Sequence, residues 1–176
     1  MINIIAFTGS LRKGSYNMAT LINAKELIKE KANIEIIDIS KLPLLNEDEE
    51  FPTPESVSDF RKKLNDSDGI LIATPEYNYS IPPVLKNALD WASRGEEINN
   101  KPVAIISASP SILGGSRAQY QLRQIFVALN LNVINDPEVF ITKANEKFDE
   151  NGQLIDEYTR MSIVKLLTAL IKEIEK

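Results

Sequence analysis

The stretch Ile2–Asn17, INIIAFTGSLRKGSYN, joins a short apolar run to a loop rich in glycine and serine. Residues Ile2–Thr8 are nearly all apolar, which is typical of a β-strand covered on both faces of a sheet. The loop leads directly into Asn17–Ala32, where apolar residues recur at helical spacing. This stretch therefore predicts a strand, a tight loop and a helix, the repeating unit of α/β proteins.

The same alternation continues along the rest of the chain. Short apolar runs predict four more strands, at Ile34–Asp38, Gly69–Thr74, Pro102–Ser107 and Leu131–Val139. Segments with helical spacing predict four more helices, at Val57–Ser67, Pro82–Ser93, Gly115–Leu129 and Asp156–Lys176. Five such units joined by short loops predict an α/β fold with a doubly wound parallel sheet and helices on both faces. Because no linker interrupts the pattern, residues 1–176 are expected to form a single domain.

Composition restricts the chemistry that the side chains can supply. The chain has no Cys and no His, which excludes thiolate nucleophiles, disulfides, Ser-His-Asp triads and zinc held by cysteine or imidazole. A reactive group is therefore expected from a bound cofactor, or from carboxylate, Lys, Tyr or Ser chemistry. We expect no metal site, since four consecutive acids at Glu47–Glu50 predict a solvated surface.

Charge and hydropathy indicate where the protein works. The formal net charge of −5 argues against a general nucleic-acid binder, which needs a basic face. The apolar run at the N-terminus is too short for a signal peptide or a membrane span. We therefore expect a cytoplasmic protein without nucleic-acid or membrane partners.

The first loop has the composition of an anion-binding site. Ligands of doubly wound sheets bind beyond the carboxyl ends of the strands, so the loops after Thr8, Thr74 and Ser107 are the places to look for function. Glycines allow a tight backbone path, while hydroxyls, a guanidinium and a helix N-terminus can all donate to an anion. The residues concerned are Gly9, Ser10, Arg12, Gly14, Ser15 and Asn17, the last of which is expected to cap the helix. Ser15 stands where a triphosphate-binding loop has its lysine, and the G-x-G-x-x-G pattern is absent, so a terminal monophosphate is the expected ligand.

The second loop, PEYNYS, gathers polar and aromatic side chains at the end of a strand. Asn78 and backbone amides could hydrogen-bond the polar edge of a planar heterocycle, and Tyr77 could lie against its face. A tyrosine buried in the core is the alternative reading of Tyr77. Trp91, in the helix that follows, is expected to pack in the core.

Together, GSLRKGSYN and the later PEYNYSIPPVLKNALDW resemble the NADPH-dependent FMN reductase family, specifically its quinone and chromate reductase branch. The resemblance continues through GGSRAQYQLRQ and covers essentially the whole chain. It implies a three-layer, flavodoxin-like fold with a five-stranded sheet in the order 2-1-3-4-5. It also implies a homodimer or homotetramer with Arg117, Tyr120 and Glu138 at subunit contacts, although an ordinary surface helix explains Arg117 and Tyr120 almost as well.

In that family the first loop binds the FMN phosphate and the second contacts the ribityl chain and the isoalloxazine ring. A third loop, here SASPSILGGSR, touches the ring. The resemblance therefore implies the FMN-binding residues Ser10, Arg12, Ser15, Tyr16, Asn17, Met18, Pro75, Glu76, Tyr77, Asn78, Ser107 and Ser109.

The same resemblance implies an NAD(P)H-dependent oxidoreductase in which FMN, and no side chain, carries the chemistry. NAD(P)H would pass hydride to N5 of FMN, and quinones, flavins, azo compounds or metal oxyanions such as chromate would then take the electrons in ping-pong order. Two alternatives stay open, a flavodoxin-type electron carrier without NAD(P)H turnover and a flavin-free sensor or phosphosugar-binding module. The sequence does not distinguish NADH from NADPH as the donor.

Overall fold

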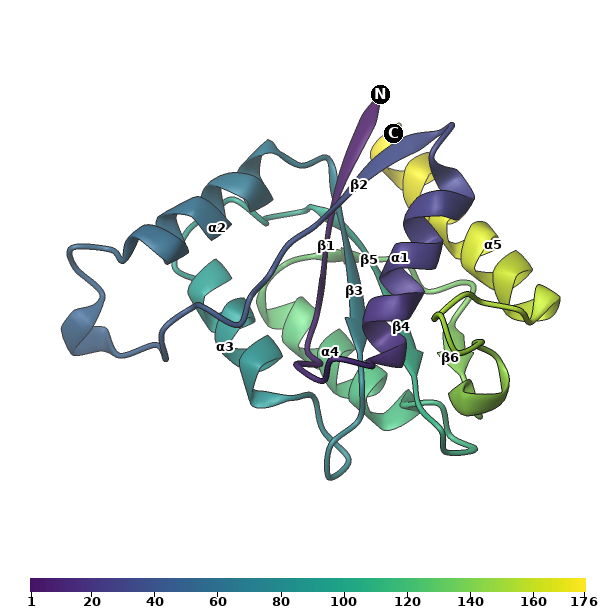
Figure 1. Cartoon of the computed structure of the whole chain (residues 1–176). Coiled ribbons are helices and arrows are strands. Elements are labelled where there is room, and N and C mark those ends of the chain that lie inside the picture. Colours follow the sequence, from purple (N-terminus) through teal and green to yellow (C-terminus); the bar gives the residue numbers. More distant parts are fainter.

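The computed structural model describes residues 1–176 and has one twisted parallel sheet at its centre. Its main strands are β1 (Ile2–Thr8), β2 (Ala32–Ile36), β3 (Gly69–Thr74) and β4 (Pro102–Ala108). With the short strand β5 (Asn132–Val133) beside β4, the strand order is β2-β1-β3-β4-β5 (Figure 1), which confirms the predicted flavodoxin-like topology. The carboxyl ends of β1, β3 and β4 therefore lie side by side at one edge of the sheet.

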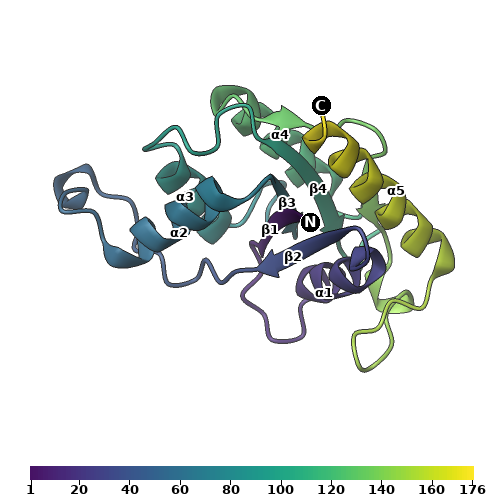
Figure 2. The same ribbon diagram turned by 90° about the horizontal axis from the view of Figure 1, so that it is seen from above.

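Helices cover both faces of the sheet because successive strand residues point to opposite sides. In β1, Ile4 and Ala6 belong to one apolar core with α1 (Tyr16–Ile28) and α5 (Glu157–Ile174). The alternate residues Ile5 and Phe7 belong to a second core. That core includes residues of α2 (Glu55–Asp66), α3 (Pro83–Ala92) and α4 (Ser116–Ala128). Figure 2 shows the resulting three layers, which confirms the doubly wound arrangement.

The far edge of the sheet differs from the sequence-based prediction. Instead of one strand over Leu131–Val139, the structure has β5 (Asn132–Val133) and β6 (Val139–Ile141), so the sheet has six strands. Both pair with β4, β5 near its start and β6 at its end. The segment between them includes Pro137, which has no N–H to continue a ladder, and the pairing stops before it.

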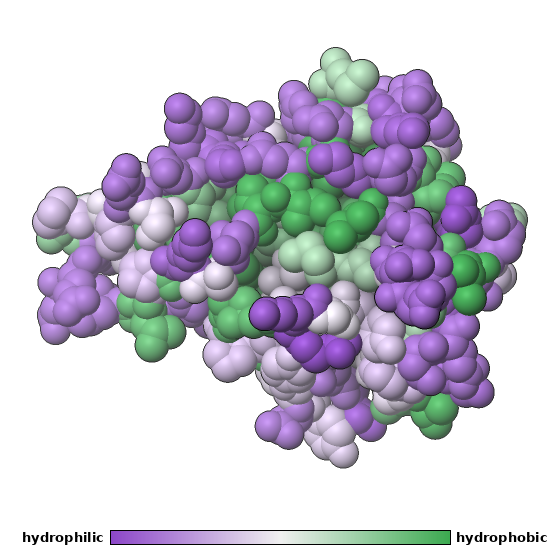
Figure 3. Space-filling view, in the orientation of Figure 1, coloured by the Kyte–Doolittle hydropathy of each residue, from purple (hydrophilic) through white to green (hydrophobic).

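The edge strand β2 begins two residues earlier than predicted, since Ala32 already pairs with Ile2. Its exposed Glu35 forms an ion pair with Lys63 of α2, and charged residues on an edge strand discourage pairing with other chains. On the face shown in Figure 3, hydrophobic residues gather near the middle of the molecule, and hydrophilic residues surround them.

The long segment between β2 and α2 lies along α3, and its short 3₁₀-helix (Glu47–Glu49) is exposed. Asn87 donates to the carbonyl of Pro43 over 2.8 Å and accepts from the N–H of Leu45 over 2.9 Å. Trp91 is buried, as predicted, and its indole N–H donates to the same Pro43 carbonyl over 2.7 Å. No helix of the chain combines the length and apolar character that a bilayer span requires.

Candidate functional site

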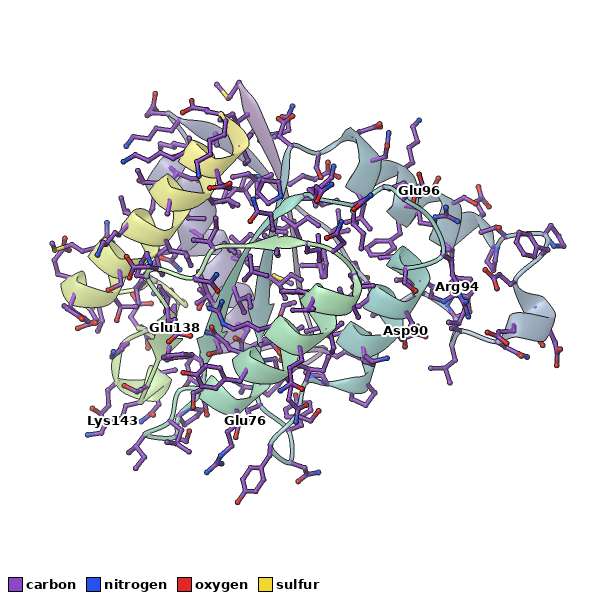
Figure 4. The ribbon with its side chains drawn as sticks, turned by 180° about the vertical axis from the view of Figure 1, so that it is seen from behind. Glu76, Asp90, Arg94, Glu96, Glu138 and Lys143 are labelled. Atoms are coloured by element: carbon purple, nitrogen blue, oxygen red, sulfur yellow. The ribbon has the colours of Figure 1, made fainter.

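The three loops singled out in the sequence meet at the carboxyl edge of the sheet. Thr8 is in register with Ala73, and Thr74 is in register with Ser107, so the strands end at the same level. The N–H of Gly9 donates to the carbonyl of Ala73 over 3.3 Å, which extends the pairing into the first loop. Glu76, in the second loop, lies at this lower edge in Figure 4.

The first loop and the start of α3 are in direct contact. A Cβ atom at Gly9 would lie 3.0 Å from Cβ of Leu85 and 3.0 Å from Cγ of Pro82. A side chain here would be closer to these atoms than side chains normally pack, so glycine suits the approach. The two long motifs, far apart in the sequence, are therefore adjacent in space.

The start of α1 presents several donors to one side of the first loop. Ser15 is the N-cap, and its hydroxyl accepts from the N–H of Met18 over 3.3 Å. The N–H groups of Tyr16 and Asn17 fall in the first turn, where an α-helix offers no acceptor of its own. Together with the positive end of the helix dipole, these groups suit an anion.

Arg12 adds a positive charge to this loop. Its guanidinium lies 5.3 Å from the centre of the Tyr16 ring, and it forms none of the chain's salt bridges. The neighbouring Ser10 is largely buried, and its N–H donates to the hydroxyl of Thr8 over 3.1 Å. Arg12 is therefore available to a phosphate, whereas Ser10 is held in place by the strand end.

Asn17 does not cap the helix, so that prediction is wrong. Its buried amide donates to the carbonyl of Ala108 over 3.0 Å and accepts from the Ala108 N–H over 2.9 Å. The cap position belongs to Ser15, two residues earlier. An asparagine near a helix start can bond locally or across the fold, and the sequence pattern does not separate the two.

The second loop forms a tight turn that projects from the sheet edge. Tyr77 and Ser80 exchange two backbone hydrogen bonds of 2.9 Å, and the two residues between them, Asn78 and Tyr79, have φ angles of 49° and 66°. Two left-handed residues between such a pair are typical of a type I′ turn. Tyr77 and Asn78 are exposed. The alternative interpretation of Tyr77, as a tyrosine buried in the core, is therefore wrong. Pro75, at the base of the loop, is buried.

The carboxylate of Glu76 is already paired within the chain. One oxygen accepts from the backbone N–H of Arg117 over 3.0 Å, and the other lies 3.2 Å from the Arg117 guanidinium. That guanidinium lies 4.0 Å from the centre of the Tyr79 ring. The sequence reading missed this partnership, because nothing in the local pattern around Glu76 points to a residue on α4.

The third loop is held by a buried polar group that the sequence reading also missed. The amide of Gln119 donates over 2.8 Å to the hydroxyl of Ser107 and over 2.8 Å to the carbonyl of Val139. Ser107 is fully buried, so its side chain faces this network. Ser109 is half-buried, and its hydroxyl accepts from the N–H of Ser111 over 3.2 Å. Of the two predicted ring contacts, Ser109 is therefore the accessible one.

Two of the three residues expected at subunit contacts, Tyr120 and Glu138, belong to a small polar group within the chain. The Tyr120 hydroxyl lies 3.5 Å from the carboxylate of Glu138, which also pairs with Arg123 at 3.4 Å. Tyr120 is half-exposed. The group joins α4 to the segment before β6.

The chain is similar to known NAD(P)H-dependent oxidoreductases in both sequence and structure. Residues 2–146 match the family model described as NADPH-dependent FMN reductase. An NAD(P)H-dependent FMN reductase of Pseudomonas aeruginosa is 46% identical over 172 residues, which are 96% of this chain and 93% of that protein. An NAD(P)H:quinone oxidoreductase of Solanum tuberosum is 46% identical over 178 residues, 97% of this chain and 91% of the other. Among solved structures, a flavoenzyme NAD(P)H:(acceptor) oxidoreductase from Paracoccus denitrificans has a TM-score of 0.92 and 31% identity, covering 99% of this chain and 98% of that one.

Proposed function

Because the chain belongs to the NADPH-dependent FMN reductase family, we propose that the loops after β1, β3 and β4 form one FMN site. The protein is an NAD(P)H-dependent oxidoreductase of the kind that reduces flavins and quinones. The contact of Gly9 with Pro82 and Leu85 supports the proposal, because the loop proposed to hold the phosphate lies beside the motif proposed to hold the ring.

The phosphate end of FMN would lie at the start of α1. The backbone N–H groups of Tyr16 and Asn17 have no acceptor within the helix, and Arg12 forms none of the chain's salt bridges. A phosphate dianion satisfies all of these donors at once. Ser10, Ser15 and Met18 complete this part of the predicted site.

The ring end would lie between the second and third loops. The exposed Tyr77 and Asn78 offer a ring face and an amide, and the half-buried Ser109 offers a hydroxyl. Glu76 and Ser107 have internal partners, so we assign them to holding the loops in place, with Pro75 buried at the base. A planar tricyclic group held against these exposed side chains would keep one face accessible to small molecules.

Bound FMN supplies two-electron transfer from NAD(P)H to an acceptor, so the chain needs no acid, base or nucleophile of its own. Its residues would hold the phosphate and orient the ring, and we propose that the donor and the acceptor use the exposed ring face in turn, in ping-pong order. Besides quinones and flavins, azo compounds and metal oxyanions such as chromate are proposed acceptors. We further propose a cytoplasmic, single-domain protein that assembles as a homodimer or homotetramer.

Steady-state kinetics of the FMN-reconstituted protein tests this function and separates it from an electron carrier. We expect continuous oxidation of NADPH or NADH on addition of a quinone, with parallel lines in double-reciprocal plots as ping-pong order requires. A flavodoxin-type carrier would bind FMN without turning over the nucleotide. Protein that stays colourless after incubation with FMN would contradict both.

A further inference from the structure

One buried side chain connects the two ends of the proposed FMN site. Asn17, the second residue of α1, is 3% exposed, and its amide forms two hydrogen bonds with the backbone of Ala108 at the end of β4. Ala108 directly precedes Ser109 of the third loop. The helix that would hold the phosphate and the strand that leads into the ring-side loop are thus joined through one amide.

The contact lies at the end of the central sheet. The ladder between β3 and β4 ends with the pair Thr74 and Ser107, one residue before Ala108. The Asn17 amide supplies one acceptor and one donor, as a further strand residue would.

We infer that Asn17 is a positioning residue that fixes the spacing between the phosphate end and the ring end of the site. This inference rests on the proposed function. FMN engages both ends with one molecule, so its affinity depends on the two ends being held at the matching separation. Riboflavin has the ring without the phosphate, and its affinity depends on the ring end alone.

The same helix provides a matched control. Asn23 is also a buried asparagine of α1, and its amide also bridges to distant backbone, donating to Gly152 and accepting from Leu154 over 2.8 and 3.0 Å. Its partners lie in the hairpin around residues 148–154, outside the three loops. Asn17→Ala and Asn23→Ala therefore each remove a two-bond amide bridge from α1, and only the first lies in the proposed site.

The experiment measures the dissociation constants of FMN and riboflavin for the wild type and both variants, by quenching of flavin fluorescence. We expect Asn17→Ala to lower the preference for FMN over riboflavin by about tenfold, and Asn23→Ala to leave it within about twofold of the wild type. If the wild-type protein binds FMN and Asn17→Ala has the same preference for FMN over riboflavin, the inference is overturned and the proposed function stands. Wild-type protein that binds no FMN would instead overturn the proposed function, and the inference with it.

A second variant keeps the test valid if Asn17→Ala does not fold. Asn17→Ser retains a small polar group but cannot reach both atoms of the Ala108 backbone. Amide exchange at Ala108 in the wild type and in this variant then reports the bridge directly. Faster exchange together with a reduced preference for FMN supports the inference, and faster exchange with an unchanged preference overturns it.

Discussion

The carboxylate of Glu76 accepts a hydrogen bond from the backbone N–H of Arg117 and lies 3.2 Å from its guanidinium. Arg117 is the second residue of α4, so its N–H has no acceptor within the helix. Glu76 therefore serves the start of α4 in the way a capping side chain does, although it belongs to a different loop. This contact links the second loop to the third-loop side of the site.

Replacing Glu76 should separate its capping role from its charge. Glu76→Ala leaves the Arg117 N–H without an acceptor, and we expect a loss of about 1–2 kcal/mol in the free energy of unfolding. Glu76→Gln keeps an acceptor and loses only an ion pair to a half-exposed arginine, so the loss should be below about 1 kcal/mol. Urea unfolding of the three proteins measures both values, and equal losses would contradict a capping role.

Arg12 should contribute to FMN affinity through the phosphate alone. We expect Arg12→Ala to weaken FMN binding by about 1.5–3 kcal/mol, because a guanidinium–phosphate hydrogen bond is charge-assisted. Riboflavin affinity should stay unchanged. Lys13→Ala, at the exposed neighbouring position, is the control and should have little effect. Flavin fluorescence titration provides the measurement; unaltered FMN affinity in Arg12→Ala would show that the backbone amides suffice.

Asn78 needs two substitutions because its backbone is left-handed, with φ of 49°. Asn78→Gly keeps that conformation accessible and removes the amide, so it should change flavin affinity or reduction potential with little effect on folding. Asn78→Ala adds a backbone cost of roughly 1 kcal/mol to the same loss. Potentiometric titration with bound FMN, beside thermal unfolding, distinguishes the two effects. A wild-type potential and affinity in Asn78→Gly would remove Asn78 from the site.

Asp156 should make the stability of α5 depend on pH in the acidic range. It is the N-cap of α5, and hydrogen bonds from Thr159 hold the pKa of its carboxyl below the ordinary value of 3.8. A lowered pKa in the folded state means that the stabilisation is complete above pH 3.8 and is lost as the pH falls through the folded-state pKa.

Substitutions of Asp156 check this directly. We expect Asp156→Ala to cost about 1 kcal/mol near pH 7, and Asp156→Asn to cost less because asparagine is also a good N-cap. The difference between wild type and Asp156→Asn should shrink as the pH is lowered below 3.8. Denaturant unfolding at neutral and acidic pH gives the comparison, and a difference that grows in acid would contradict the assignment.

The strands that carry the site could be predicted from the sequence, because a strand that is buried on both faces of the sheet is a continuous apolar run. β1, β3 and β4 follow this rule, and their predicted bounds agree with the structure to within one residue. The strands at the far edge of the sheet, beside β4, were harder to predict. Apolar residues stand at both ends of Leu131–Val139 and suggest a strand, but polar residues and Pro137, which has no N–H, separate β5 from β6.

The loops were recognisable from composition, whereas the partners of their polar side chains were not. Asn17, Glu76 and Ser107 are each placed in the predicted site, yet their side chains bond to Ala108, Arg117 and Gln119. These contacts cross long stretches of sequence, and hydrophobic periodicity contains no information about them. Only the fold shows which polar groups remain free for a ligand and which hold the loops together.

A crystal structure of the protein with FMN tests the central claim most directly. We expect the phosphate at the first turn of α1 within hydrogen-bond distance of Arg12, and the ring between the second and third loops with Tyr77 and Asn78 beside it. A phosphate bound away from α1, or a ring that does not touch the loop after β3, would contradict it.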